Sequence, residues 1–188
     1  AALAAYQRTI VSGNSRFDKW RYGGAKDAMT VQEIAGFKLF TGRAKCASCH
    51  QIQDTFALFT DQAFHDIGYG WKRHREKKVA GKNLQDLGRF EVTGDPRDRW
   101  RYCTPSLRNI ALTAPYMHDG GLETLEDVIR FYNGGGAPHD GQDIRIRKLD
   151  LSNKEIAALA AFLRTLTGDN IAKLVEDART GHGARSDN

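Results

Sequence analysis

The chain has 188 residues, of which 40% are hydrophobic, and this is enough for one large or two small domains with a proper core. No run approaches the ~18 consecutive apolar residues of a transmembrane helix, so we expect no membrane span. The formal net charge of +5 favours docking to an acidic protein partner. It does not indicate nucleic-acid binding. The basic residues cluster in the run from Trp71 to Lys78, which has no recognisable nucleic-acid-binding fold around it and which we predict to be a solvated surface loop.

The first predicted helix runs from Glu33 to Thr41. The four residues from Thr30 to Glu33 have the pattern of a capping box, in which a threonine hydroxyl and a glutamate satisfy backbone amides at a helix start. Apolar side chains recur toward one side of this helix. Gly36 within it costs about 1 kcal/mol of helix stability relative to alanine, so we predict that another helix approaches closely there.

Residues 46–50 read Cys-Ala-Ser-Cys-His, and C-x-x-C-H is the attachment site of a c-type haem. We expect Cys46 and Cys49 to form thioethers to the two vinyl groups and His50 to ligate the iron from the proximal side. A redox dithiol would need a βαβ context, and a zinc site would need a second pair of ligands. The sequence has neither, so it predicts one covalent haem c.

Covalent haem c is assembled outside the cytoplasmic membrane, so we expect a periplasmic protein whose leader has been removed. The third cysteine, Cys103, is then unpaired in a compartment where thiols tend to oxidise. We predict a buried free cysteine that acts as a small hydrophobe, and a disulfide to another chain is the alternative.

Residues 51–150 are rich in Gly, Asp and Arg, and we expect irregular loops and short helices that enclose the haem. One helix is predicted inside this region, from Leu122 to Tyr132. It has an apolar face and acidic residues in its first turns, which is favourable for the helix dipole. Three glycines, 134–136, end it.

The strongest predicted helix begins at a second capping box, Ser152 to Glu155, and Gly168 ends it. Apolar residues recur along it at helical spacing. We predict that it crosses the first helix where Gly36 admits Phe162. This arrangement resembles the crossed N- and C-terminal helices of class I cytochromes c.

Several long motifs follow one another in the order found in a known family. They are Asn14–Trp20, the C-x-x-C-H, Phe64–Gly68, Gly88–Pro96, Thr104–Gly120 and the final helix. Together they resemble the C-terminal haem domain of bacterial dihaem cytochrome c peroxidases and their MauG-type relatives, over nearly the whole chain from Ala1 to Gly168. The resemblance implies a mostly α, class I cytochrome c-like haem domain with long irregular loops at residues 30–168. A junction-like N-terminal segment, 1–29, precedes it, and a C-terminal tail, 169–188, follows.

The same resemblance implies metal ligands. The family's peroxidases have a distal methionine at a fixed spacing after the proline of a Thr-Ala-Pro stretch, and MauG-type enzymes have tyrosine there. Counting from Pro115, this chain has Tyr132 at that position, and Met117 is the alternative distal ligand. A Ca²⁺ between the haem domains would be held by the backbone carbonyls of Thr113 and Pro115 together with an asparagine from the other domain.

Members of the family carry two C-x-x-C-H motifs, whereas this chain has one. The resemblance therefore implies the electron-relay part of a peroxidase or MauG-like oxidoreductase, working with a second haem-bearing domain or subunit. In that role it passes oxidising equivalents between a peroxide-reactive haem and a redox-partner protein or a protein substrate. The alternative is a stand-alone mono-haem c-type cytochrome that only carries electrons. A third hypothesis is that this haem is itself catalytic because no sixth ligand binds.

Overall fold

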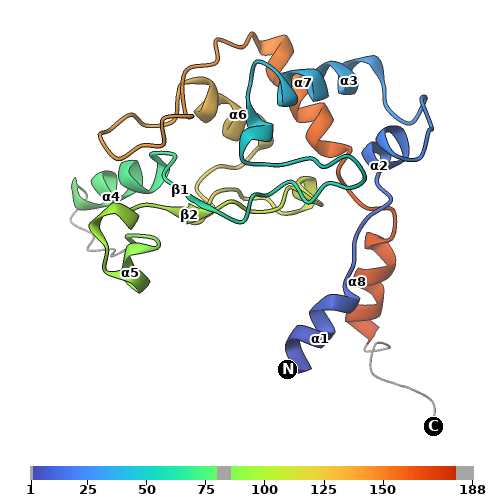
Figure 1. The fold of residues 1–188 in the computed structure, drawn as a ribbon, viewed down its shortest axis with the longest axis horizontal. Coiled ribbons are helices and arrows are strands. Elements are labelled where there is room, and N and C mark those ends of the chain that lie inside the picture. The colour runs from blue at the N-terminus through green and yellow to red at the C-terminus, as the bar shows by residue number, and fades with distance from the viewer. Residues whose placement is uncertain (1, 80–85, 181–188) are drawn as a thin grey trace.

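The structure, a computed structural model, describes residues 2–79 and 86–180 (Figure 1). The α-helices are α1 Ala2–Thr9, α2 Arg16–Arg21, α3 Val31–Thr41, α4 Tyr69–Val79, α5 Phe90–Thr93, α6 Leu125–Asn133, α7 Asn153–Arg164 and α8 Ile171–Thr180. Short 3₁₀ helices are η1 Cys46–Ser48, η2 Pro96–Asp98 and η3 Ile110–Leu112. Strands β1 Phe64–His65 and β2 Tyr102–Cys103 pair antiparallel. The described part of the chain is therefore mostly α, as predicted.

Helices α3 and α7 both begin at the predicted capping boxes. Thr30 accepts from the Glu33 amide, and the Glu33 carboxylate accepts from the Thr30 amide at 2.8 Å. Ser152 and Glu155 make the same reciprocal pair at the start of α7. Both helix starts are thus determined by local sequence.

The predicted crossing of α3 and α7 is confirmed, and the two helices lie against each other in Figure 1. A Cβ placed on Gly36 would lie 2.0 Å from the Ala158 carbonyl oxygen and 2.8 Å from Cβ of Phe162. Any side chain at position 36 would therefore push the two backbones apart.

The core around this crossing is aromatic. The Phe162 ring lies 5.1 Å from that of Phe40 and 5.8 Å from that of Phe17, and Phe17 lies 5.3 Å from Phe59. All four rings are at most 2% exposed. Tilted and edge-on contacts of this kind add to the free energy gained by burial.

Helix α6 begins at Leu125, three residues later than predicted. Leu122 is extended because its backbone pairs with that of Tyr116, and the Thr124 side chain then caps the helix by accepting from the Asp127 amide. The helix ends at Asn133, where the predicted glycine run begins. Its buried face, Leu125 and Ile129, joins the core next to α7.

The basic run was wrongly predicted as a loop, because it forms helix α4. The helix has no apolar stripe that would signal it in the sequence. It is stabilised by the Arg75 guanidinium over the Trp71 ring at 4.9 Å, by ion pairs of Lys72 and Arg73 with Glu76, and by stacking of Trp71 on His139 at 4.8 Å.

The N-terminal segment contains α1 and α2, and the C-terminal segment contains α8. Figure 1 shows α1 and α8 extending away from the rest of the chain. Asn170 donates to the Val11 carbonyl at 2.8 Å, so the two segments meet at their inner ends. No helix among residues 2–79 and 86–180 combines the length and apolar character needed to cross a membrane.

Arg108 joins three distant segments. Its guanidinium donates to both carboxylate oxygens of Asp18, at 2.6 and 2.8 Å, and to the Ala57 carbonyl at 2.7 Å. Burial alone would raise the pKa of Asp18, but hydrogen bonds from Arg108 and Ser15 lower it overall. The pair therefore attaches α2 to the loops before and after the two-stranded sheet.

We predict that Gly36→Ala lowers the free energy of unfolding by about 1–3 kcal/mol, because the added methyl overpacks the crossing. Without the neighbouring helix, replacing glycine by alanine would stabilise α3 by about 1 kcal/mol. A loss of stability in Gly36→Ala therefore indicates that α7 lies against position 36. Chemical denaturation measures it. Gly13→Ala is the control, since a Cβ there meets no atom within 4 Å. Equal losses in the two variants would contradict the crossing.

We predict that Asp18→Asn destabilises the protein by about 1–3 kcal/mol at pH 7, because the Arg108 guanidinium loses its charged partner. The folded-state pKa of Asp18 is lowered, so its contribution is present at neutral pH and is lost as the pH falls. The stability gap should therefore begin to narrow below about pH 4 and close as the pH falls through the lowered pKa of Asp18. A gap that is constant with pH would show that the ionised pair contributes nothing.

Candidate haem site

The predicted attachment residues lie in a tight turn just after α3. The amides of Cys49 and His50 both donate to the Cys46 carbonyl, at 3.3 and 2.9 Å. No disulfide joins any of the three cysteines, Cys46, Cys49 and Cys103. Burial raises the pKa of Cys46 to about 12 and also raises that of Cys49.

The orientation of His50 is set by the loop that follows it. Its Nδ1 lies 2.8 Å from the Phe59 carbonyl oxygen, which can only accept, so Nδ1 carries the proton and Nε2 keeps its lone pair. Burial lowers the pKa of His50, which favours the neutral ring. A neutral imidazole whose other nitrogen donates to a carbonyl is the form that ligates a metal.

Tyr132 lies in the last turn of α6, far in sequence from the attachment residues. Burial raises the pKa of its phenol, and the charged forms of the Cys46 and Cys49 thiols would raise it further.

Met117, the alternative ligand, occupies a turn and has a left-handed backbone, with φ of 70°. Its carbonyl accepts from the Gly120 amide at 3.4 Å. In the part of the chain that the structure describes, no hydrogen bond or ring contact joins it to the attachment turn. The same holds for Tyr132, whose ring contacts Phe131, so Tyr132 stays the predicted distal ligand and Met117 the alternative.

Thr113 and Pro115 are exposed at the end of η3. Their two carbonyls would supply only part of the six to eight oxygens that Ca²⁺ takes. A calcium ion at this position would need ligands from elsewhere.

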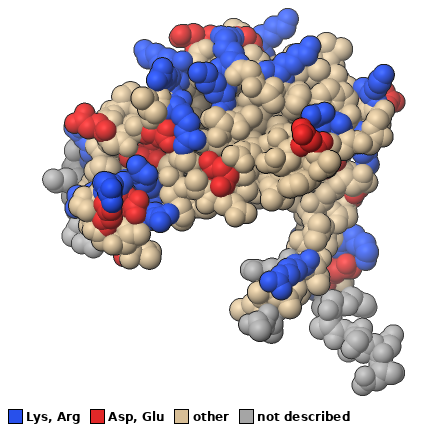
Figure 2. Space-filling view, viewed as in Figure 1, with Lys and Arg blue, Asp and Glu red and all other residues tan. Residues whose placement is uncertain are grey.

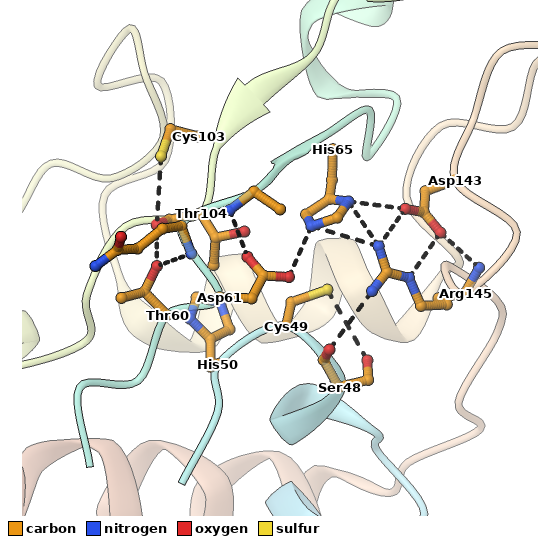
Figure 3. Close-up of polar contacts among 12 residues, drawn as sticks. Ser48, Cys49, His50, Thr60, Asp61, His65, Cys103, Thr104, Asp143 and Arg145 are labelled. Atoms are coloured by element: carbon orange, nitrogen blue, oxygen red, sulfur yellow. Dashed lines mark hydrogen bonds and ion pairs between the residues drawn. The ribbon is translucent and has the colours of Figure 1, made fainter. Parts of the chain in front are cut away.

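Sequence reasoning missed a charged cluster beside Cys49, shown in Figure 3. His65 lies between two carboxylates, 2.9 Å from Asp61 at Nε2 and 2.9 Å from Asp143 at Nδ1. Arg145 donates to Asp143 at 2.6 Å and lowers its pKa. The same guanidinium reaches the Ser48 carbonyl at 3.5 Å, so this cluster positions the attachment turn. The four-residue spacing of Asp61 and His65 was its only signal in the sequence.

Three potential metal-binding atoms meet in this cluster, because the ligand atoms of Cys49, Asp61 and His65 lie within 4.8 Å of one another. A thiol, a carboxylate and an imidazole could bind a transition metal. If Cys49 forms a thioether, as its motif predicts, its thiolate is no longer available. Two ligands then remain, which is fewer than a closed metal site needs.

Cys103 was wrongly predicted to be buried. It is exposed, at the end of strand β2. The reason is the alternation of side chains along a strand, which turns Tyr102 inward and Cys103 outward.

The residues present fit a covalently attached haem. Cys46 and Cys49 lie in the turn of η1, and the loop to Phe59 holds His50 in the ligating tautomer. A tyrosine, Tyr132, is available from α6. These are the groups that attachment and axial ligation need.

Comparisons with known proteins show the family of this chain. The family model described as cytochrome c matches residues 33–167. The methylamine utilization protein MauG of Methylorubrum extorquens is 39% identical over 172 residues, covering 92% of this chain and 44% of that protein. A cytochrome-c peroxidase, IdrP1, of Denitromonas iodatirespirans is 35% identical, covering 89% of this chain and 49% of that protein.

Solved structures give the same result. A MauG-like protein associated with microbial copper homeostasis superposes with a TM-score of 0.76 at 36% identity, covering 90% of this chain and 56% of that one. The diheme peroxidase BthA of Burkholderia thailandensis gives 0.68 at 26% identity, covering 82% of this chain and 46% of that one. The chain spans about half the length of the curated relatives it matches.

We predict that Tyr132→Phe changes the optical spectrum of the ferric protein, because loss of the phenol opens the distal position or recruits another ligand. Met117→Leu is the control and should leave the spectrum unchanged. A spectrum that moves with Met117 and not with Tyr132 would reverse the assignment.

Proposed function

Because the chain belongs to the cytochrome c family and is homologous to MauG and to cytochrome c peroxidases, we propose that it passes oxidising equivalents between a peroxide-reactive haem and a donor or protein substrate. The family implies a covalent haem c. The observation that carries the proposal is the attachment turn with Cys46, Cys49 and a His50 held in the ligating tautomer by the Phe59 carbonyl, because these groups would attach a haem and bind its iron.

In this proposal Cys46 and Cys49 hold the haem, His50 is the proximal ligand and Tyr132 the distal one. When bound, the haem supplies an iron that changes oxidation state, and a phenolate ligand stabilises the oxidised form. The chain's own residues fix the ligand geometry: Phe59 orients His50, and α6 holds Tyr132. If His50 and Tyr132 both bound the iron, no position would be left for peroxide, and this chain would serve electron transfer while another haem reacts with peroxide.

The second haem is assigned to a further domain or subunit, with this chain as the C-terminal, electron-relay part. The support is that the chain spans about half of its relatives and that one of them is described as a diheme peroxidase.

Leu112, next to the proposed calcium carbonyls of Thr113 and Pro115, is 59% exposed. An apolar side chain beside incomplete calcium ligands is what a contact with the second haem domain would cover. We place this assembly in the periplasm, where haem c is attached.

The alternative function is a mono-haem electron carrier, which the same haem-binding residues would serve equally. Basic residues gather on the upper face over α3, α6 and α7 (Figure 2), and this face suits an acidic redox partner in both cases. The partner's haem content therefore distinguishes the two functions.

We predict that the native assembly contains two covalent haems for each copy of this chain, and that it consumes peroxide. Mass measurement and haem staining of the purified complex test the haem count. Cys46→Ser with Cys49→Ser should remove one haem from the count, whereas Cys103→Ser should remove none. A one-haem monomer that is indifferent to peroxide in periplasmic extract would establish the electron carrier instead.

A further inference from the structure

A series of aromatic rings leads from Tyr132 to strand β2. Phe131 packs edge-on against Tyr132 at 5.6 Å and against Tyr69 at 5.5 Å. Tyr69 packs edge-on against His118 at 5.5 Å, and His118 stacks on Tyr102 at 3.9 Å. The rings are in contact throughout, from the proposed distal ligand to the edge of the two-stranded sheet.

Two tyrosines of this series, Tyr69 and Tyr102, each donate their hydroxyl to a carboxylate. Tyr69 donates to Asp119 at 3.0 Å, and Tyr102 donates to Asp86 at 2.8 Å. Asp86 also pairs with Nε2 of His118 at 3.1 Å, so it connects both members of the stacked pair. Carboxylates are bases that can take a phenol proton when the ring is oxidised.

Other tyrosines of the chain differ in this respect. Tyr22 donates to the Gln53 carbonyl and Tyr116 to the Ile110 carbonyl, and a peptide carbonyl does not accept a proton at neutral pH. Tyr116 is 8% exposed, so burial alone does not bring a tyrosine to a carboxylate in this fold.

Two glycines make room for these phenols. A Cβ on Gly121 would lie 2.1 Å from the Tyr69 hydroxyl, and a Cβ on Gly70 would lie 2.7 Å from Cε2 of Tyr102. Tyr69 is 3% exposed. Its ring and hydroxyl are therefore held in one position by packing.

We propose that Tyr69 and Tyr102 are redox-active residues that relay oxidising equivalents from the Tyr132 side of the haem site to the surface at β2. The inference rests on the proposed function, which supplies a peroxide as the oxidant. It adds a route by which a donor or protein substrate is oxidised without reaching the haem.

Each step moves one electron and one proton. Tyr69 loses an electron toward the oxidised haem site, and its hydroxyl proton moves to Asp119, which leaves a neutral phenoxyl radical. Tyr102 then loses an electron to Tyr69 through His118 and its proton to Asp86, while Asp119 returns the first proton. Tyr102 finally takes an electron from the substrate and its proton back from Asp86. Each peroxide reduced to water takes two electrons, so the relay operates twice.

The environment of Tyr69 favours coupled transfer over prior ionisation. Burial, and then the hydrogen bond to Asp119, raise the pKa of Tyr69 to about 12. The phenol therefore stays protonated at neutral pH, and oxidation releases its proton into the hydrogen bond that is already formed.

The chain offers a site from which to test the relay, because Cys103 is exposed next to Tyr102 and is the one cysteine outside the attachment motif. A ruthenium(II) polypyridyl complex is attached to Cys103 of the protein carrying ferrous haem, and a flash with a quencher oxidises it to ruthenium(III). The rate of haem oxidation and the transient phenoxyl absorbance are then recorded. We expect Tyr69→Phe and Tyr102→Phe each to slow haem oxidation by at least about tenfold, and Asp119→Asn to slow it although the phenol remains.

Tyr116→Phe is the matched control and should keep the wild-type rate. Equal rates in all variants, or no phenoxyl signal in the wild type, would overturn the relay. Haem attachment is read from the optical spectrum before the flash, so a protein without covalent haem contradicts the proposed function alone. Ruthenium(III) can oxidise Tyr102 and Tyr69 in a protein that lacks haem. Their phenoxyl signals therefore still test the relay if no haem is attached.

Discussion

The close approach of two backbones at Gly36 is the constraint on which the rest of the structure depends. It places Phe162 of α7 against Phe40 of α3 and closes an aromatic core that also holds Phe59. The carbonyl of Phe59 in turn orients His50. The packing of the two helices therefore fixes the position of Phe59, and Phe59 in turn orients His50, whose Nε2 is proposed to bind iron.

Side chains position the rest of the site, because most of the chain between α3 and α7 has no extended regular structure. Arg145 attaches the turn at Ser48 to the loop before α7, and Arg108 attaches α2 to the loop at Ala57. The Arg108 side chain is only 17% exposed, so its charge needs a partner, since an unpaired charge inside the fold is costly. Tyr69 is held in a related way, by Asp119 and by the space left at Gly121.

Local patterns in the sequence were sufficient for several features. The capping boxes at Thr30 and Ser152 gave both helix starts, because a cap is satisfied within one turn of chain. The Cys-x-x-Cys-His run indicated haem for the same reason, since all its groups are adjacent. Gly36 predicted a close helix crossing, because a glycine in a helix interior has a cost that packing must offset. Tyr132 came from family resemblance alone.

The tertiary structure decided what depends on residues far apart in sequence. Helix α4 was missed because its stability comes from ion pairs and from Trp71 stacked on His139, not from an apolar stripe. The exposure of Cys103 was wrongly predicted because the side of the sheet that it faces is set only when β2 pairs with β1. Neither the cluster around His65 nor the carboxylate beside Tyr69 has a local signal, because their partners come from distant loops. The sequence by itself determined the cofactor chemistry and the helix starts, since those groups are neighbours along the chain. Only the fold decided which bases and rings surround them, because such contacts form when distant segments pack.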